Sequence, residues 1–279
     1  MKLVGWAALY VGIGLVVVST AAWYLQGYLI YHPRPYAPIV LTVLPPHLVE
    51  ITYNTAQGPQ VAFYLPPHDS PTHVPEALWV LFHGNGSLAL EWFKHLRQGP
   101  QTHTGLLLID YPGYGKCTGR SSRDAIIASF EAALHTLQQR YPAVRPAIER
   151  SLNVLGYSLG AAVALELATR YPTQHIVLLA PFTSMYDIAS HMVVWPITTL
   201  LRERFDNRQT LTTLAQRPVS PAVTIIHGEA DEVVPVAMGR ALARSFPAMI
   251  TYHELVGATH SILARATPLL MQAIEGRAE

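Results

Sequence analysis

The five residues Gly156-Tyr157-Ser158-Leu159-Gly160 decide how this chain is interpreted. They follow the apolar run Leu152–Leu155 and precede an apolar segment with helical spacing, Leu159–Tyr171. In a G-x-S-x-G motif between a strand and a helix, the serine lies on a sharp turn that presents its hydroxyl at the edge of a sheet. The amino terminus of the following helix also stabilises negative charge. Ser158 is therefore the candidate nucleophile.

Short apolar runs and amphipathic segments alternate along most of the chain. This alternation is typical of βαβ units, in which a mostly parallel sheet is covered by helices on both faces. The sequence therefore predicts an α/β fold. The predicted strands are residues 49–55, 61–65, 78–82, 106–110, 152–155, 176–179, 223–226 and 250–254, and the predicted helices are 88–97, 122–140, 159–171, 237–245 and 261–274.

Residues 182–220 interrupt the alternation. They are interspersed with proline and contain the charged segment Arg202-Glu203-Arg204-Phe205-Asp206. The insertion begins after a predicted strand, at the edge where α/β sheets bind ligands. We therefore expect a short helical cap over the site.

A serine hydroxyl is a weak nucleophile, so it needs a general base that is oriented by an acid. His260 lies in Gly257-Ala258-Thr259-His260-Ser261, between the last predicted strand and the last predicted helix. A loop at that place can carry a base to the serine. His253 lies inside a predicted strand, and His227 closes a strand before a glycine, which is more typical of packing at a turn. His260 is therefore the candidate base.

The acid is expected in the loop after the penultimate predicted strand. This loop is His227-Gly228-Glu229-Ala230-Asp231-Glu232-Val233-Val234-Pro235. It contains three carboxylates, Glu229, Asp231 and Glu232, and its position alone leaves all three open.

An acyl-transfer site also needs two backbone N–H groups that stabilise the developing oxyanion. The N–H of Leu159, directly after the candidate nucleophile, is the first. The second is expected in His83-Gly84-Asn85-Gly86, which follows the predicted strand at 78–82. We prefer Asn85 there, with Gly86 as the next choice.

The composition excludes several classes of protein. Of 279 residues, 50% are hydrophobic and only 13% are charged, against roughly 25% charged in an average soluble domain. This balance excludes a disordered chain. The 19 basic and 18 acidic residues nearly cancel, so we expect no nucleic-acid partner. We found no phosphate-binding loop and no convincing spacing of metal ligands, and we therefore expect neither a cofactor nor a metal.

The amino-terminal segment is apolar and carries no charge from Leu3 to Leu25. These 23 residues would span about 34 Å as a helix, enough for a hydrocarbon core of roughly 30 Å. Aromatic residues cluster at its carboxyl end, as they do at membrane interfaces. We therefore predict a single-pass membrane anchor. A cleaved signal peptide, with Ser19 and Ala21 near the cleavage site, and a buried core helix are the alternatives.

This segment suggests three parts of the chain. Residues 1–30 are the expected anchor, residues 31–47 a proline-rich connector, and residues 48–279 the catalytic domain. From the sparse flanking charges we expect the amino terminus inside and the catalytic domain on the exoplasmic or periplasmic face.

Taken in order, these motifs resemble a known family. The loop H-G-N-G, the run Asp110-Tyr111-Pro112-Gly113-Tyr114-Gly115-Lys116, the segment Pro181-Phe182-Thr183-Ser184-Met185, the R-x-R-F-D patch and the final G-A-T-H-S accompany the G-Y-S-L-G motif. The chain is similar to the membrane-anchored α/β-hydrolase family related to the yeast bud-emergence protein. Its members also resemble this chain in having one amino-terminal membrane helix before a Y-x-P connector, here Tyr31-His32-Pro33.

The resemblance implies a site and an activity. It implies the triad Ser158, Asp231 and His260, because H-G-x-x-D-x-x-V-P is the usual form of the acid loop in these hydrolases. The segment Cys117-Thr118-Gly119 departs from the serine-acidic-glycine that is more common in the family. We therefore expect a serine hydrolase that cleaves a hydrophobic acyl ester or thioester. A serine peptidase or aminopeptidase with the same triad is one alternative, and a non-catalytic, membrane-tethered interaction protein is the other.

Overall fold

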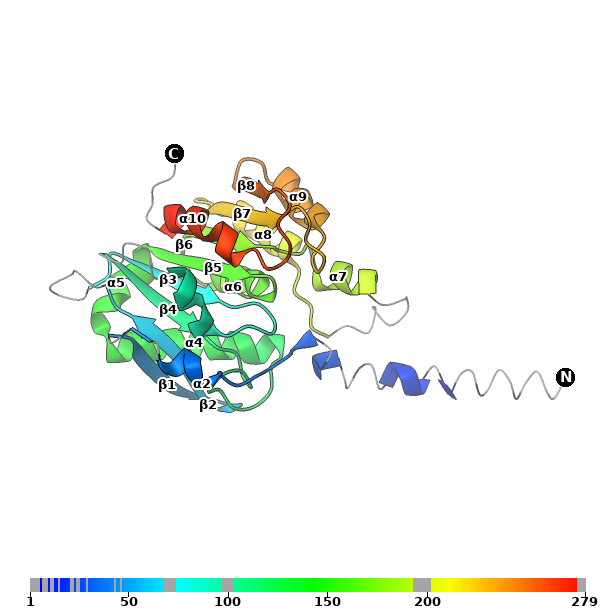
Figure 1. The fold of residues 1–279 in the computed structure, drawn as a ribbon, viewed down its shortest axis with the longest axis horizontal. Coiled ribbons are helices and arrows are strands. Elements are labelled where there is room, and N and C mark those ends of the chain that lie inside the picture. Colours follow the sequence, from blue (N-terminus) through cyan, green and yellow to red (C-terminus); the bar gives the residue numbers. More distant parts are fainter. Residues whose placement is uncertain are drawn as a thin grey trace.

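An eight-stranded sheet forms the centre of the computed structural model (Figure 1). Its strand order is β1-β2-β4-β3-β5-β6-β7-β8. Strands β1 and β2 are antiparallel to their neighbours, and every pairing from β4 to β8 is parallel. The predicted, mostly parallel sheet is thereby confirmed. The strands are β1 (Val49–Thr55), β2 (Gly58–Leu65), β3 (Ala77–Phe82), β4 (Thr104–Ile109), β5 (Leu152–Tyr157), β6 (Thr173–Leu179), β7 (Ala222–Gly228) and β8 (Ile250–Leu255).

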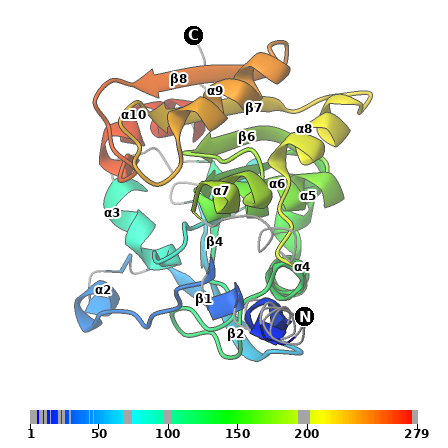
Figure 2. The same ribbon diagram turned by 90° about the vertical axis from the view of Figure 1, so that its right-hand side faces the viewer.

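Helices cover both faces of this sheet, as Figure 2 shows. Helices α4, α5, α6 and α8 lie on one side of it, and α3 and α10 lie on the other. The structure describes residues 6, 10, 13–14, 16–20, 23, 26–28, 30–42, 44–45, 47–67, 74–96, 103–192 and 202–274. Its helices are α2 (Pro38–Thr42), α3 (Phe93–Leu96), α4 (Arg123–Arg140), α5 (Arg145–Arg150), α6 (Leu159–Arg170), α7 (Met185–Met192), α8 (Asn207–Ala215), α9 (Val236–Ser245) and α10 (Leu263–Ile274), with short 3-10 turns at Ala89–Trp92 and Pro142–Val144.

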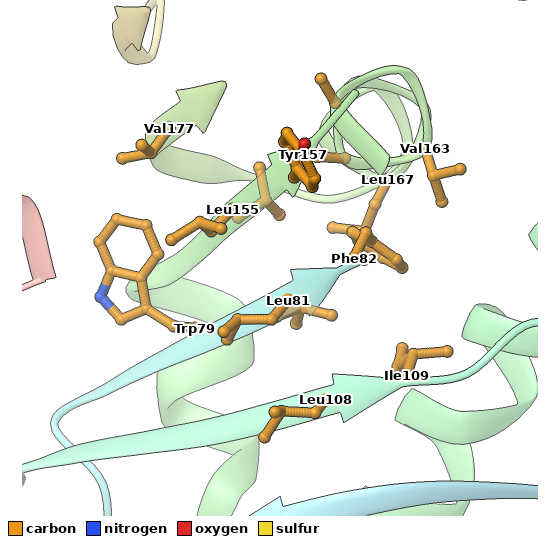
Figure 3. Packing of buried hydrophobic residues seen from close by; sticks show 14 of the residues in the cluster. Trp79, Leu81, Phe82, Leu108, Ile109, Leu155, Tyr157, Val163, Leu167 and Val177 are labelled. Carbon is orange, nitrogen blue, oxygen red and sulfur yellow. The ribbon is translucent and has the colours of Figure 1, made fainter. Parts of the chain in front are cut away.

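The central strands are apolar on both faces because both faces are covered. On β3, Phe82 points toward Val163 and Leu167 of α6, whereas Trp79 and Leu81 lie on the opposite face (Figure 3). All five side chains are buried. Burying one such side chain stabilises the fold by about 1.5–3 kcal/mol. This packing fixes the carboxyl ends of β3 and β5, from which the loops of the candidate site extend.

The insertion after β6 contains α7 and α8. It is closed at its base, because the Met185 N–H donates to the Phe205 carbonyl (2.7 Å) and the Asn207 N–H donates to the Thr183 carbonyl (3.0 Å). Helix α8 packs on α6, and α7 lies in front of the central strands in Figure 2. Residues 193–201 of this insertion lie outside the described residues.

The predicted anchor falls mostly on residues that the structure does not describe. Within the described part of the chain, no helix combines the length and apolar composition needed to cross a membrane.

Candidate active site

Ser158 lies on a strained turn between β5 and α6. Its backbone angles are φ 54° and ψ −115°, in a region that costs a residue other than glycine about 1–3 kcal/mol. The two flanking glycines allow this turn. A Cβ on Gly160 would come within 2.2 Å of the Phe82 carbonyl oxygen, and one on Gly156 within 2.1 Å of the Gly160 oxygen. The motif therefore places a half-buried serine hydroxyl at the amino terminus of α6.

Two loops bring a histidine and an aspartate to this serine. The Nε2 atom of His260, in the loop after β8, lies 3.2 Å from Ser158 Oγ. The Nδ1 atom of the same ring lies 2.8 Å from Asp231 Oδ2, in the loop after β7. The Asp231 side chain is fully buried, and that of His260 is 14% exposed. The structure thus brings the predicted nucleophile, base and acid into one hydrogen-bonded chain.

The surroundings of Asp231 keep it ionised and oriented. Its Oδ1 atom accepts the N–H groups of Val233 (2.9 Å) and Val234 (2.7 Å). Its Oδ2 atom also lies 3.3 Å from Nε2 of buried His227. Burial favours the neutral carboxyl, but the hydrogen bonds from the two histidines and the Val234 N–H outweigh it and hold the pKa of Asp231 well below its usual range. A carboxylate in this state can fix the tautomer of His260.

The two other carboxylates of the acid loop bind backbone instead. Glu229 accepts the Gly257 N–H at 2.9 Å, and Glu232 accepts the His260 N–H at 3.1 Å. Both therefore brace the loop that carries His260. Tyr157 adds a third contact, because its hydroxyl donates to the His260 carbonyl at 2.8 Å.

The predicted oxyanion loop lies against the serine turn. Phe82 and Gly156 are register partners on neighbouring strands, so the residues that follow each of them leave the sheet side by side. A Cβ on Gly84 would approach the Tyr157 ring to 2.8 Å. Leu159 is the first residue of α6, and an N–H at that position has no partner within its helix. None of the hydrogen bonds between described residues uses the Asn85 N–H.

His83 lies behind this loop and is fully buried. Its Nδ1 lies 2.8 Å from the Gly84 carbonyl and must donate to it, and its Nε2 lies 3.4 Å from Asp110 Oδ1. Burial lowers the pKa of His83 to about 4 and raises that of Asp110 to about 6. His83 is therefore neutral at pH 7 and braces the loop, and it is too far inside to act as a second base.

The sequence of the chain matches the profile of the alpha/beta hydrolase family over residues 79–209. This match spans the predicted oxyanion loop, the serine turn and the start of α8. Over these residues the chain is similar to the alpha/beta hydrolase family. Its relatives include an uncharacterized protein of Mycobacterium tuberculosis, which is 29% identical over 249 residues that cover 88% of this chain and 83% of that protein.

A second relative is named after this family. Human alpha/beta hydrolase domain-containing protein 17B is 31% identical over 173 residues, which cover 60% of this chain and 55% of that protein. Among solved structures, an esterase of Pyrococcus furiosus superposes with a TM-score of 0.63 at 14% identity, covering 88% of this chain and 97% of that one. At that identity the likeness shows the fold alone.

Sequence reasoning missed the contribution of the connector to this candidate site. Tyr31 and Tyr36 are buried in the hydrophobic core, and the segment between them contacts the predicted oxyanion loop. The signal was present in the alternation of aromatic and proline residues in Tyr31-His32-Pro33-Arg34-Pro35-Tyr36. An extended linker would have no reason to carry two buried tyrosines.

Cys117 is also buried, and burial raises its pKa to about 12. Its sulfur accepts the Val61 N–H at 3.3 Å. A thiol in this state is not a nucleophile at neutral pH, so the departure from the family pattern at Cys117 concerns packing.

Proposed function

We propose that this chain is a serine hydrolase that cleaves a carboxylic ester or thioester. Ser158 Oγ attacks the acyl carbonyl carbon, its proton passes to His260 Nε2, and the carbonyl electron pair moves to oxygen. The Leu159 and Asn85 N–H groups stabilise this oxyanion, and Asp231 stabilises the imidazolium. Collapse of the tetrahedral intermediate expels the alkoxide or thiolate, which takes the proton from His260 and leaves an acyl-enzyme. Water then attacks the acyl-enzyme by the same steps and releases the carboxylic acid.

The observation that carries this proposal is the hydrogen-bonded chain Asp231–His260–Ser158, with distances of 2.8 and 3.2 Å. A non-catalytic scaffold has no use for a serine held at positive φ against a base. The positions of these groups at loops on one edge of the sheet, together with the strained turn, support acyl transfer.

An aminopeptidase is less well supported by the cap. Such an enzyme needs a free carboxylate to hold the substrate amine. The charged segment of the insertion offers Glu203 and Asp206 for this role. Glu203 accepts the Tyr31 hydroxyl (2.6 Å) and the Arg123 N–H (2.6 Å). Asp206 caps α8 through the Gln209 N–H at 2.9 Å. Both carboxylates therefore have structural partners.

Covalent labelling tests the proposal directly. A fluorophosphonate probe should label the full chain once, and peptide mass spectrometry should place the label on Ser158. The Ser158→Ala variant should remain unlabelled while melting at the same temperature, because the change removes one oxygen from a half-buried position. Labelling of that variant at an undiminished rate would refute the assignment of the nucleophile, and an unlabelled, folded wild type would favour the non-catalytic alternative.

We further propose that residues 3–25 anchor the catalytic domain in a membrane and that its substrate is hydrophobic. Described apolar side chains in this segment are largely exposed, among them Tyr10 (67%) and Val16 (66%). Exposed apolar runs of this kind are stable in lipid. The full chain should sediment with membranes and resist extraction at pH 11, whereas Val16→Asp/Val17→Asp should be extracted. Extraction of both the wild type and the variant would contradict the anchor. Protease protection of residues 48–279 in sealed vesicles would show on which side of the membrane the catalytic domain lies.

A further inference from the structure

The connector runs along the oxyanion loop and is hydrogen-bonded to it. The His32 N–H donates to Asn85 Oδ1 at 2.9 Å, and Asn85 Nδ2 donates to the Ile30 carbonyl at 2.5 Å. Arg34 Nε donates to the Gly86 carbonyl at 2.6 Å. His32 and Arg34 of the connector, together with Ile30 just before it, thus contact two residues of the loop. The contacts join parts of the chain more than fifty residues apart, so they belong to the tertiary structure.

The Asn85 side chain uses its whole hydrogen-bonding capacity in these contacts. Its Oδ1 atom also accepts the Tyr114 hydroxyl at 2.7 Å, and its Nδ2 lies 3.1 Å from His32 Nδ1. An amide has two acceptor and two donor positions, and all four have partners. The side chain is therefore fixed in the structure, and what Asn85 can offer an oxyanion is its backbone N–H.

Arg34 joins the loop to the helical turn that follows it. Its Nη2 donates to both carboxylate oxygens of Glu91 at 2.7 and 2.6 Å. Glu91 in turn accepts the Leu88 N–H at 3.1 Å. The Arg34 carbonyl accepts the Gly115 N–H at 2.9 Å, which ties the same residue to the loop after β4. Arg34 therefore contacts the loop after β3, the helical turn that follows it and the loop after β4.

The two tyrosines secure the connector on either side of Arg34. The Tyr31 hydroxyl donates to Glu203 of the cap at 2.6 Å. The Tyr36 hydroxyl donates to buried Asp110 at 2.5 Å, and Asp110 also accepts the Ala89 N–H at 2.8 Å. The connector is thus fastened to the cap at one end and to the core behind His83 at the other.

These contacts have a catalytic consequence, because an oxyanion donor lowers a barrier only if it is already in place. A donor that must be ordered during the reaction loses most of its effect, and one well-placed donor contributes about 10²–10³-fold in kcat. Gly84 and Gly86 flank Asn85, and glycine gives a backbone more conformational freedom than any other residue. Without the connector, the loop would sample orientations in which the Asn85 N–H points away.

We infer that the connector is part of the active site: Arg34, together with the Asn85–Tyr114 pair, positions the loop that supplies the second oxyanion donor. The inference rests on the proposed serine-hydrolase function and deepens it. On this inference the segment Tyr31–Tyr36 both joins residues 1–30 to the rest of the chain and belongs to the catalytic centre. Arg34 and Tyr114 are positioning residues, since they act through Asn85 and its neighbours.

Point variants of the full chain test this inference. Arg34→Ala and Tyr114→Phe should each lower kcat for a p-nitrophenyl ester by about 10-fold, part of the effect of one donor, with KM changed less than twofold. A trifluoromethyl ketone forms a tetrahedral adduct with a catalytic serine, and its affinity should fall by the same factor as kcat/KM. This parallel loss identifies an effect on the oxyanion, because a transition-state analogue reports interactions that the bound ester does not make.

The chain provides matched controls for both variants. Arg240 and Glu254 form a two-point ion pair with side-chain exposures of 42% and 25%, against 39% and 25% for Arg34 and Glu91. Tyr53 is a buried tyrosine whose hydroxyl pairs with Ser129 at 3.0 Å. Arg240→Ala and Tyr53→Phe should lower the melting temperature about as much as the test variants while leaving kcat and the ketone affinity unchanged.

The outcomes separate the inference from the function on which it rests. If wild type binds the ketone but Arg34→Ala and Tyr114→Phe keep wild-type kcat and affinity, or change KM alone, the connector does not position the donor. If wild type neither turns over esters nor binds the ketone, the proposed function itself fails. If Arg34→Ala does not fold, Tyr114→Phe decides the question, because it removes a single oxygen.

Discussion

The double variant Ser158→Ala/His260→Ala should hydrolyse a p-nitrophenyl ester no more slowly than Ser158→Ala alone. Each single change should lower kcat by about 10⁴- to 10⁶-fold, because a base without its nucleophile and a nucleophile without its base are equally inactive. In the proposed mechanism, the 3.2 Å contact between Oγ and Nε2 joins the two groups into one catalytic unit. Residual hydrolysis in all three variants would come from binding and the oxyanion donors.

Steady-state kinetics of the three variants at one pH check this expectation. His227→Gln is an instructive comparison, because this second buried histidine touches Asp231 but not the serine. His227→Gln should lower kcat much less than His260→Ala does. Additive losses in the double variant would mean that Ser158 and His260 act in separate steps, which would contradict the proposed mechanism.

Asp231→Asn should lower kcat by about 10³- to 10⁴-fold with little change in KM. The N–H groups of Val233 and Val234 both point at Oδ1, so the amide oxygen of an asparagine would take that place. Its NH₂ group would then occupy the position of Oδ2, 2.8 Å from His260 Nδ1. An N–H at that place forces Nδ1 to accept and leaves the proton on Nε2, where it blocks proton transfer from Ser158.

Kinetics of Asp231→Asn beside Glu229→Gln test this argument. Glu229 lies in the same loop and also accepts a backbone N–H, but it does not contact the imidazole. Glu229→Gln should therefore keep kcat within a few-fold of wild type. Retention of more than a tenth of wild-type kcat by Asp231→Asn would show that another carboxylate orients His260.

The strands were predictable because a buried sheet imposes a simple pattern. A strand covered on both faces must be apolar throughout, and β3 at Ala77–Phe82 shows this in an uninterrupted run. Helix α4 was equally clear, since Ser122 caps its first turn by accepting the Ala125 N–H at 3.1 Å. These signals are local, so they can be read within a window of a few residues.

Other elements could not be predicted from local signals. Helix α2 at Pro38–Thr42 has five residues and buries none of them, so no periodicity marks it. Helix α5 at Arg145–Arg150 has only six residues, with Pro142 before it and Pro146 in its first turn. Short elements of this kind are stabilised by packing against the rest of the chain, and the sequence does not display that packing.

The candidate site, like the fold, was predictable from the sequence only in part. The sequence by itself determined the α/β fold, the serine turn and the choice of His260, because each depends on a motif next to a strand or a helix. It left Glu229, Asp231 and Glu232 open on position alone. Only the tertiary structure shows that Asp231 points at the imidazole, while the two glutamates hold backbone N–H groups.

The position of the connector was also decided only by the tertiary structure. Nothing within Tyr31–Tyr36 shows that Arg34 will meet Gly86 and Glu91, more than fifty residues later in the chain. Such contacts depend on where the sheet delivers the end of β3, and that position follows from the packing of the whole core. A sequence pattern records the forces between neighbours along the chain, whereas the geometry of a catalytic centre is set by distances between segments that the fold brings together.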